Sequence, residues 1–353
     1  MRVLLTHELF PPDFAGGGEY LVLRTAQQLT QRGLTVRVLT TGNPRITEYE
    51  GVSTFRLPIH RYRFNLAVRK IAQLAREADL IQTFNYHACL PSLLAGKLTR
   101  KPVVCMALGL FHDAWKEMRL PLAGALWSAW EQFQITRGFT RVIFLSPHSY
   151  ELGLSLGVAR ERSVMIFPGI DLENYGPASE KENVVFFTGK LDVRKGIFDF
   201  LEVARALPEV RFRVMGWGRQ ETHIRSIAPP NVEFLGFKRG ESLHRALGAA
   251  RIFFFPTRAE PFGLALAEAM ASGCAIISTS PLEFEGIRVP IGDRHAMAQA
   301  VRHLWASHTD TDRMGRRNIE LAQQYNWNRY TSALLDVYSS VLKRNPTPQA
   351  RHR

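Results

Sequence analysis

Short apolar runs recur along the chain, and each is followed by a longer segment in which apolar residues return at helical spacing. Unbroken apolar runs of this length are typical of strands that are buried on both faces of a parallel sheet. A first series of runs predicts strands over residues 3–6, 36–39, 79–83, 103–107, 142–145 and 164–167. A second series predicts strands over residues 184–187, 212–215, 232–235, 252–255 and 275–277. With helical patterns between them, such as residues 19–31, the runs predict an α/β fold with doubly wound sheets.

A change of composition separates the two series of strands. Gly176-Pro177-Ala178-Ser179, followed by charged residues, is the clearest linker signal in the sequence. A chain of 353 residues also exceeds what one hydrophobic core usually organises. We therefore predict two domains, over residues 1–175 and 182–326, followed by a helix within residues 325–342.

The segment from Arg251 to Ser280 holds the clearest candidate site. After the strand over 252–255, a loop with Glu260 leads into a helix predicted over 264–270, and Glu268 lies two turns into that helix. Ligands of such sheets bind at the carboxyl ends of the strands. The first amides of the helix, those of Phe262, Gly263 and Leu264, suit an anionic or hydroxyl-rich ligand. Glu268 can accept hydrogen bonds from a diol such as a ribose, although an acidic first turn and a solvated glutamate remain an alternative.

Two other loops carry residues suited to phosphate groups. Lys190 and Lys195 follow the strand over 184–187 between glycines, where cations can neutralise a diphosphate without a metal. Surface lysines beside a turn are the alternative. Gly16, Gly17 and Gly18 follow the first strand and precede a helix, but glycines are frequent in loops generally.

The segment from Glu260 to Gly273 resembles the Glu-x7-Glu signature of glycosyltransferase family 4, in type, spacing and the flanking Phe262-Gly263. The resemblance implies a GT-B fold, with two Rossmann-like domains facing an interdomain cleft and the helix over 327–343 packing back on the first. It also implies sugar transfer from a nucleotide donor with retention of anomeric configuration. Glu260 and the amides of residues 262–264 would hold the sugar, and Glu268 would hold the nucleotide ribose.

Further motifs are similar to those of the same family, in the family's order. PPDFAGGGEY is similar to its amino-terminal motif, in which Gly16 and Gly17 would let donor phosphates or acceptor approach the backbone. Residues 189–196 resemble its Gly-Arg-Leu…Lys-Gly motif, with Lys190 in place of the arginine, and Lys195 would act on the leaving diphosphate. Gly216, after the strand over 212–215, completes the predicted donor-binding set. The family's histidine falls at Leu108-Gly109 in this chain, so His112 is our candidate to replace it as a catalytic residue, with a plain loop histidine as the alternative.

The resemblance leads us to expect a hexosyltransferase of glycolipid, lipopolysaccharide or exopolysaccharide synthesis that needs no cofactor or metal. Asp310-Thr311-Asp312 has the composition of a metal-binding acidic pair, but it lies in a polar stretch between predicted helices rather than after a buried strand. A nucleotide-sugar epimerase of the same fold remains an alternative. So does a protein that binds a nucleotide or nucleic acid without catalysis.

The positive charge of the chain predicts an anionic partner. The net charge is +13 and the pI is about 10, and the excess is shared by both halves. Arg56–Arg76, which includes a helix predicted over 64–77, contains no acid and six basic residues: Arg56, Arg61, Arg63, Arg69, Lys70 and Arg76. We predict that this segment docks on an anionic membrane and brings a lipid-linked acceptor to the site. A solvated face or a nucleic-acid surface is the alternative, although no nucleic-acid-binding module accompanies the segment.

The cysteines and the amino terminus bear on the compartment. Cys89, Cys105 and Cys274 lack metal-ligand spacing, and the last two lie among apolar residues as expected of core cysteines in a reducing compartment. The apolar run before His7 is too short for a signal peptide, and no run approaches the ~20 residues of a membrane span. We therefore expect a cytoplasmic protein, soluble or peripheral on the inner face of the plasma membrane.

Overall fold

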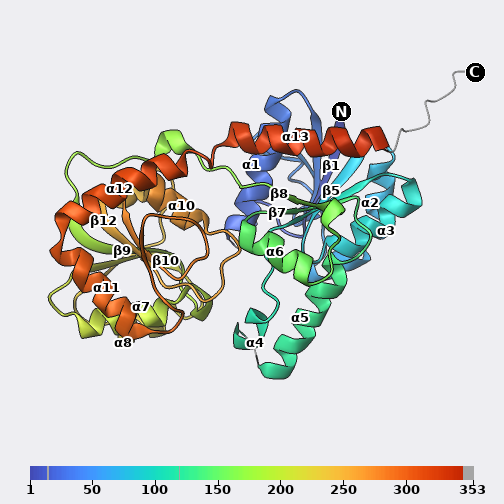
Figure 1. The fold of residues 1–353 in the computed structure, drawn as a ribbon. Helices are drawn as coiled ribbons and strands as arrows, with labels where there is room; N and C mark the ends of the chain where they lie inside the picture. The colour runs from blue at the N-terminus through green and yellow to red at the C-terminus, as the bar shows by residue number, and fades with distance from the viewer. Residues whose placement is uncertain (14–15, 119, 345–353) are drawn as a thin grey trace, which may run out of the picture. The chain divides into compact units, whose positions relative to one another are not determined.

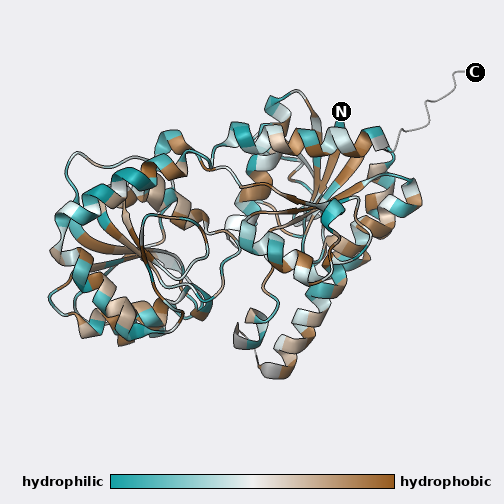
Figure 2. Cartoon of the chain, in the orientation of Figure 1, coloured by the Kyte–Doolittle hydropathy of each residue, from teal (hydrophilic) through white to brown (hydrophobic). Residues whose placement is uncertain are grey.

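A computed structural model describes residues 1–13, 16–118 and 120–344, and its chain divides into two units (Figure 1). Unit 1 comprises residues 1–113 and 125–168 and the carboxy-terminal helix from Trp327. Unit 2 comprises residues 114–124 and 169–326. Each unit has its own sheet, and many of the strand residues are apolar and coloured brown in Figure 2.

The sheet of unit 1 has the order β3-β4-β2-β1-β5-β6-β7-β8. Its strands are β1 (Arg2–Thr6), β2 (Thr35–Thr41), β3 (Glu48–Tyr49), β4 (Val52–Leu57), β5 (Leu80–Phe84), β6 (Val103–Ala107), β7 (Arg141–Phe144) and β8 (Ser163–Met165). Neighbouring strands are parallel except for β3 and β4. The chain order reverses between β1 and β5, so the loops after these two strands flank the switch point at which such sheets bind ligands.

Helices cover both faces of this sheet. They are α1 (Gly17–Gln31), the 3-10 helix η1 (Arg61–Leu66), α2 (Val68–Ala75), α3 (Cys89–Thr99), α5 (Pro121–Ile135), α6 (Pro147–Ser155) and α13 (Trp327–Arg344). The last of these lies beside α1 (Figure 1). Its buried Tyr330 hydroxyl lies 2.6 Å from that of Thr25, and its buried Tyr338 donates a hydrogen bond to Gln82. The carboxy-terminal helix is thus part of the core of unit 1.

The sheet of unit 2 has the order β11-β10-β9-β12-β13-β14, and its paired strands are parallel. Its strands are β9 (Glu182–Lys190), β10 (Phe212–Trp217), β11 (Val232–Gly236), β12 (Ala250–Phe255), β13 (Ala275–Ser278) and β14 (Gly286–Arg288). Its helices include α7 (Ile197–Ala206), α8 (Glu221–Ile227), α9 (Glu241–Ala249), α10 (Leu264–Ala271), α11 (Arg294–Ala306) and α12 (His308–Ala322). The short helix α4 (Ala114–Met118) is also grouped with this unit. Here the order reverses between β9 and β12, which places the switch point beside Lys195 and Glu260.

The predicted α/β class with two doubly wound sheets is confirmed, but some details of the prediction are wrong. β3, β4 and β14 were not predicted, and in β4 the residue Arg56 interrupts the apolar pattern. That residue is 2% exposed, and its guanidinium donates to the carbonyl oxygens of Phe10 and Pro11. Burial lowers its pKa, although Asp13 opposes this at 3.6 Å. Arg56 therefore belongs to the interior and not to a basic surface. The helix expected over 64–77 is instead the end of η1 followed by α2.

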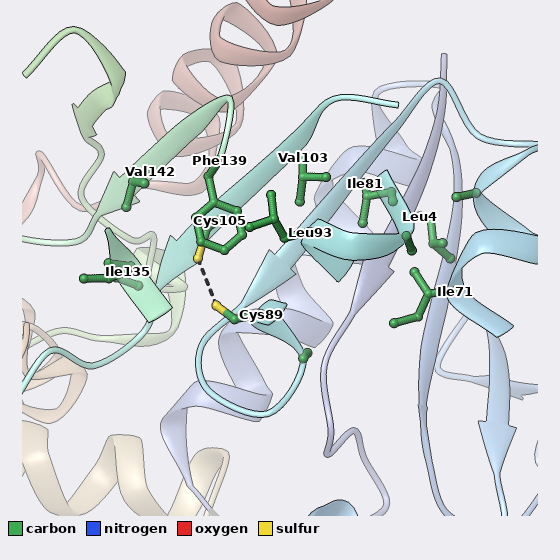
Figure 3. Packing of buried hydrophobic residues seen from close by; sticks show 14 of the residues in the cluster. Leu4, Ile71, Ile81, Cys89, Leu93, Val103, Cys105, Ile135, Phe139 and Val142 are labelled. Atoms are coloured by element: carbon green, nitrogen blue, oxygen red, sulfur yellow. Dashed lines mark hydrogen bonds between the residues drawn. The ribbon is translucent and has the colours of Figure 1, made fainter. Parts of the chain in front are cut away.

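The cysteines are buried free thiols, and two of them are in contact. Figure 3 shows Cys89 and Cys105 in the core cluster of unit 1, with their sulfur atoms 3.3 Å apart. This thiol–thiol hydrogen bond, together with burial, raises the pKa of Cys89 well above its ordinary value. Cys89 is therefore a neutral packing group in this structure.

Candidate active site

The switch point of unit 2 is built from two loops that are held together tightly. The loop after β9 forms the 3-10 turn η4 (Val193–Lys195) and ends at Gly196, which has a φ of 75°. A Cβ on Gly196 would lie 1.8 Å from the carbonyl oxygen of Pro256, so only glycine permits this approach to the end of β12. The carbonyl of Arg194 then accepts from the amide of Arg258 at 2.8 Å and from the hydroxyl of Thr257 at 3.1 Å. These contacts fix Lys195 opposite the loop that carries Glu260.

Lys195 and Glu260 form an ion pair at this switch point. The Lys195 ammonium donates to Oε2 of Glu260, and the Arg194 guanidinium lies 4.0 Å from the same oxygen. The two side chains are only 15% and 9% exposed. Burial lowers the pKa of Lys195, while the attraction of Glu260 opposes that shift. Glu260 is therefore held by two cations in this structure.

The start of α10 lies close to Glu260 of this pair. Gly263 precedes the helix with a φ of 96° and supplies no side-chain cap for the first turn. A Cβ on Gly263 would lie 3.2 Å from Cγ of Glu260, so the carboxylate and the helix start are close neighbours. Phe262 is buried and packs edge-on against Tyr325, with ring centroids 5.1 Å apart. The packing anchors the loop, while Leu264 begins the helix as expected.

Glu268 is a half-buried carboxyl with a tyrosine partner. Burial raises the pKa of Glu268 to about 7, the hydrogen bond from Tyr175 lowers it, and the nearby Asp171 raises it further. Tyr175 is itself packed edge-on against His244, with ring centroids 4.7 Å apart. Glu268 is thus poised between its neutral and charged forms near neutral pH.

Lys190 and Gly216 lie on the β10 side of β9. The strand β9 runs farther than predicted, so Lys190 is its last residue and not part of a loop. Its ammonium lies over the ring of Trp217, 5.6 Å from the centroid. A Cβ on Gly216 would lie 2.0 Å from the carbonyl oxygen of Gly189, which explains this glycine by strand packing alone. Donor binding by either residue stays a prediction.

The switch point of unit 1 holds the other predicted glycines. The helix α1 begins at Gly17, two residues earlier than predicted, and Gly16 precedes it in extended conformation. Gly17 is exposed. A Cβ on Gly18 would lie 3.3 Å from the side chain of Leu108, so the start of α1 is packed against the loop after β6. That loop carries His112.

The loop of His112 is fixed by Glu131, a buried residue of α5 that the sequence pattern did not reveal. Its carboxylate accepts from the amides of Phe111 and His112, the latter at 2.6 Å, and from the hydroxyl of Tyr86 at 2.6 Å. His112 adopts a φ of 38°, which is uncommon for a residue with a side chain. Its Nδ1 lies 3.3 Å from Asp113, and the imidazole is about three-quarters buried.

The acidic pair lies within α12, with Asp310 in its first turn and Asp312 just after it, and not between helices as predicted. Asp310 accepts from the hydroxyl of Ser307 at 2.7 Å, and Asp312 pairs with Arg251 at 2.7 Å. Hydrogen bonding from Ser307 lowers the pKa of Asp310. Within the described part of the chain, no three His, Cys, Asp or Glu side chains gather as a metal site would require.

Both parts of the sequence match models of known families. Residues 15–174 match the family described as Glycosyltransferase Family 4, and residues 182–307 match the family described as Glycosyl transferases group 1. The chain is 23% identical to the O-antigen chain mannosyltransferase C of Escherichia coli, over 97% of this chain and 99% of that protein. It is 26% identical to the GDP-mannose:cellobiosyl-diphosphopolyprenol alpha-mannosyltransferase of Xanthomonas oryzae pv. oryzae, over 97% of each. The solved structure of HepE from Anabaena in complex with UDP-glucose matches with a TM-score of 0.78 at 18% identity, over 96% of this chain and 100% of that one.

Two doubly wound parallel-sheet domains and this structural likeness define a GT-B protein. The two family matches together cover most of the sequence, one on each side of the linker. The chain therefore belongs to the glycosyltransferases, with a family 4 domain followed by a group 1 domain. Each helix of the described residues is too short or too polar to cross a bilayer.

Three residues of the site escaped the sequence analysis. Arg194 precedes Lys195 directly, and its charge in a glycine-flanked loop was a signal that could have been used. Tyr175 lies at the linker and Glu131 inside a helix, and neither position has a local pattern that points to its partner.

Proposed function

We propose that the protein is a retaining hexosyltransferase that uses a nucleoside diphosphate-sugar and acts on an acceptor hydroxyl. The observation that supports this best is the Lys195–Glu260 pair with Arg194 at the switch point of unit 2. The Xanthomonas relative is named for a GDP-mannose donor and a diphosphopolyprenol acceptor, and the E. coli relative for O-antigen. We accordingly propose a lipid-linked or oligosaccharide acceptor in cell-envelope glycolipid, lipopolysaccharide or exopolysaccharide synthesis, at the cytoplasmic face of the membrane.

In this proposal, binding of the donor separates Glu260 from Lys195, and each side chain then contacts the donor instead. The diphosphate takes the place of Glu260 beside Lys195 and Arg194, because both cations favour the more concentrated negative charge. Glu260 then accepts hydrogen bonds from hydroxyls of the donor sugar. Ionised Glu268 accepts from the ribose, and Lys190, Gly216 and the amides of residues 262–264 complete the donor site. For Gly16, Gly17 and His112 of unit 1, the roles toward donor and acceptor stay predictions.

In the reaction, the bond between the anomeric carbon and the diphosphate oxygen breaks, and negative charge grows on the diphosphate. Lys195 and Arg194 stabilise that charge where a metal ion would otherwise do so. The acceptor oxygen bonds the anomeric carbon on the same face, and its proton passes to the departing phosphate. We propose that no divalent metal takes part, because Asp310 and Asp312 are engaged with separate partners.

A panel of nucleoside diphosphates and nucleotide sugars, read by thermal unfolding, tests the donor assignment. The correct donor, present at 100 times its dissociation constant, should raise the free energy of unfolding by about 2.7 kcal/mol. Glu268→Ala should weaken both the free nucleotide and the nucleotide sugar by roughly 10–150-fold. If free nucleotide stabilises the variant as much as the wild type, the ribose assignment is wrong.

A further inference from the structure

The helix α5 exposes a continuous apolar face. Leu126, Trp130 and Phe133 are 65%, 37% and 43% exposed, and the neighbouring small residues Ala125 and Ala129 are exposed as well. These positions recur at the three- and four-residue spacing that places side chains on one side of a helix. Leu122, one turn earlier on the same helix, continues the row. Figure 2 shows apolar residues along much of this helix.

The opposite face of α5 is firmly attached to unit 1. Ser128, Glu131, Gln134 and Ile135 are buried there. Glu131 accepts the hydrogen bonds that hold the loop of His112. The orientation of the helix is therefore fixed by its polar buried side. The apolar residues point outward as a consequence of that attachment, and large apolar side chains gathered on a surface indicate an interaction site.

The 3-10 helix η1 lies near α5 and also exposes apolar side chains. Its Tyr62 and Leu66 are 52% and 80% exposed. Tyr62 packs edge-on against His87 with ring centroids 5.0 Å apart, and Asn65 is hydrogen-bonded to the same imidazole at 3.1 Å. His87 in turn lies edge-on to Trp127 of α5, at 6.4 Å. One histidine thus joins the two elements, and we call their exposed apolar side chains the α5–η1 surface: Tyr62, Leu66, Leu126, Trp130 and Phe133.

The two elements that carry the α5–η1 surface expose no acidic side chain among their described residues. The sequence from Gly51 to Arg76 contains no acidic residue, and the single acid of α5 is the buried Glu131. Arg137 lies over the ring of Phe133 at 4.0 Å, and Arg61 lies over that of Tyr62 at 5.1 Å. Arg63, which directly follows Tyr62, is exposed. Basic side chains that rim apolar and aromatic ones match a bilayer interface with anionic headgroups.

We propose that the α5–η1 surface docks the protein on an anionic lipid bilayer. The apolar side chains would enter the boundary between headgroups and acyl chains, and Arg61, Arg63 and Arg137 would contact lipid phosphates. This assignment changes the membrane contact that we predicted for Arg56–Arg76: the buried Arg56 is excluded, and α5 adds apolar side chains that the earlier segment lacks. Membrane docking does not depend on the proposed transfer reaction, so it can be tested without donor or acceptor.

Co-sedimentation of the full chain with vesicles tests the proposal. The vesicles are phosphatidylcholine alone or phosphatidylcholine mixed with phosphatidylglycerol. Each basic residue near an anionic surface strengthens binding about fivefold, so Arg63→Glu with Arg137→Glu should weaken it more than ~25-fold. Leu126→Ser with Trp130→Ser should weaken binding at least ~10-fold. Wild-type binding to the mixed vesicles should fall steeply with salt.

Matched controls distinguish this surface from a general effect of charge or hydrophobicity. Arg302→Glu with Arg316→Glu makes the same change in net charge on exposed residues of unit 2. Leu94→Ser with Leu98→Ser removes two exposed leucines from α3. Both controls should bind as the wild type does. Equal loss in a control and its test variant would overturn the proposal, as would equal binding to both kinds of vesicle. Absence of vesicle binding, with self-association that Leu126→Ser and Trp130→Ser abolish, would show instead that a second copy covers this face.

Discussion

Replacing Glu268 with glutamine should stabilise the fold while it weakens nucleotide binding. The pKa of Glu268 is raised from 4.5 to about 7, mainly by burial. An acid with a raised pKa binds its proton more tightly when folded. The protein therefore loses stability as the pH rises through the interval between these two values. Each pKa unit corresponds to 1.36 kcal/mol, so above about pH 8 the ionised carboxyl should lower the free energy of unfolding by about 3 kcal/mol.

Glutamine has the size of the protonated acid and can still accept the hydrogen bond from Tyr175, so it removes only the cost of ionisation. Chemical denaturation at two pH values measures the difference. The variant should exceed the wild type by about 3 kcal/mol near pH 8, and by less than about 1 kcal/mol near pH 5. Nucleotide affinity should change in the opposite sense, because the ionised form is the better acceptor for ribose hydroxyls. A variant that is equally or less stable than the wild type near pH 8 would refute the reasoning.

The other predictions concern the same site. Lys195→Ala should lower the turnover rate roughly 100-fold or more, because it removes about 3 kcal/mol of leaving-group stabilisation. Added chelator should leave the activity of the wild type unchanged. If chelator abolishes activity and manganese restores it, Asp310 and Asp312 would again be candidate metal ligands. Glu260→Ala should lose turnover but bind free nucleotide as the wild type does in calorimetry, and a matching loss of nucleotide affinity would contradict its role on the sugar. Tyr175→Phe removes the hydroxyl that lowers the pKa of Glu268, so the midpoint of the pH dependence of nucleotide affinity should move to higher pH. An unchanged midpoint would show that Tyr175 does not tune this carboxyl.

Much of the framework could be predicted from local patterns. Strands buried on both faces are apolar throughout, so β12 and β13 were recognisable from short runs. The end of α10 was recognisable from Gly273, which adopts the left-handed φ of 69° expected after a helix. The rule that buried strands are apolar throughout fails in β4. Arg56 looks like a surface residue in the sequence, and only the carbonyls of distant loop residues explain how it is buried.

The electrostatic partners of the site were beyond local patterns. Lys195 and Glu260 lie 65 residues apart in sequence, so each was predicted to act on a ligand and neither to hold the other. Their contact depends on the close approach of Gly196 to Pro256, which is a property of the folded sheet. The partnership of Glu268 with Tyr175 likewise joins a helix to the linker. Ion pairs between loops follow from strand order, and strand order is not encoded by any single segment.

The most direct test of the account is the stereochemistry of transfer from the donor identified by the thermal panel. Wild type and Lys195→Ala would be incubated with that nucleotide sugar and an acceptor, in the presence of chelator, and the new glycosidic bond would be followed by NMR. We predict that the wild type forms a product with the anomeric configuration of the donor, and that Lys195→Ala forms it roughly 100-fold more slowly. A product of inverted configuration, or one that forms only when divalent metal is supplied, would contradict the account.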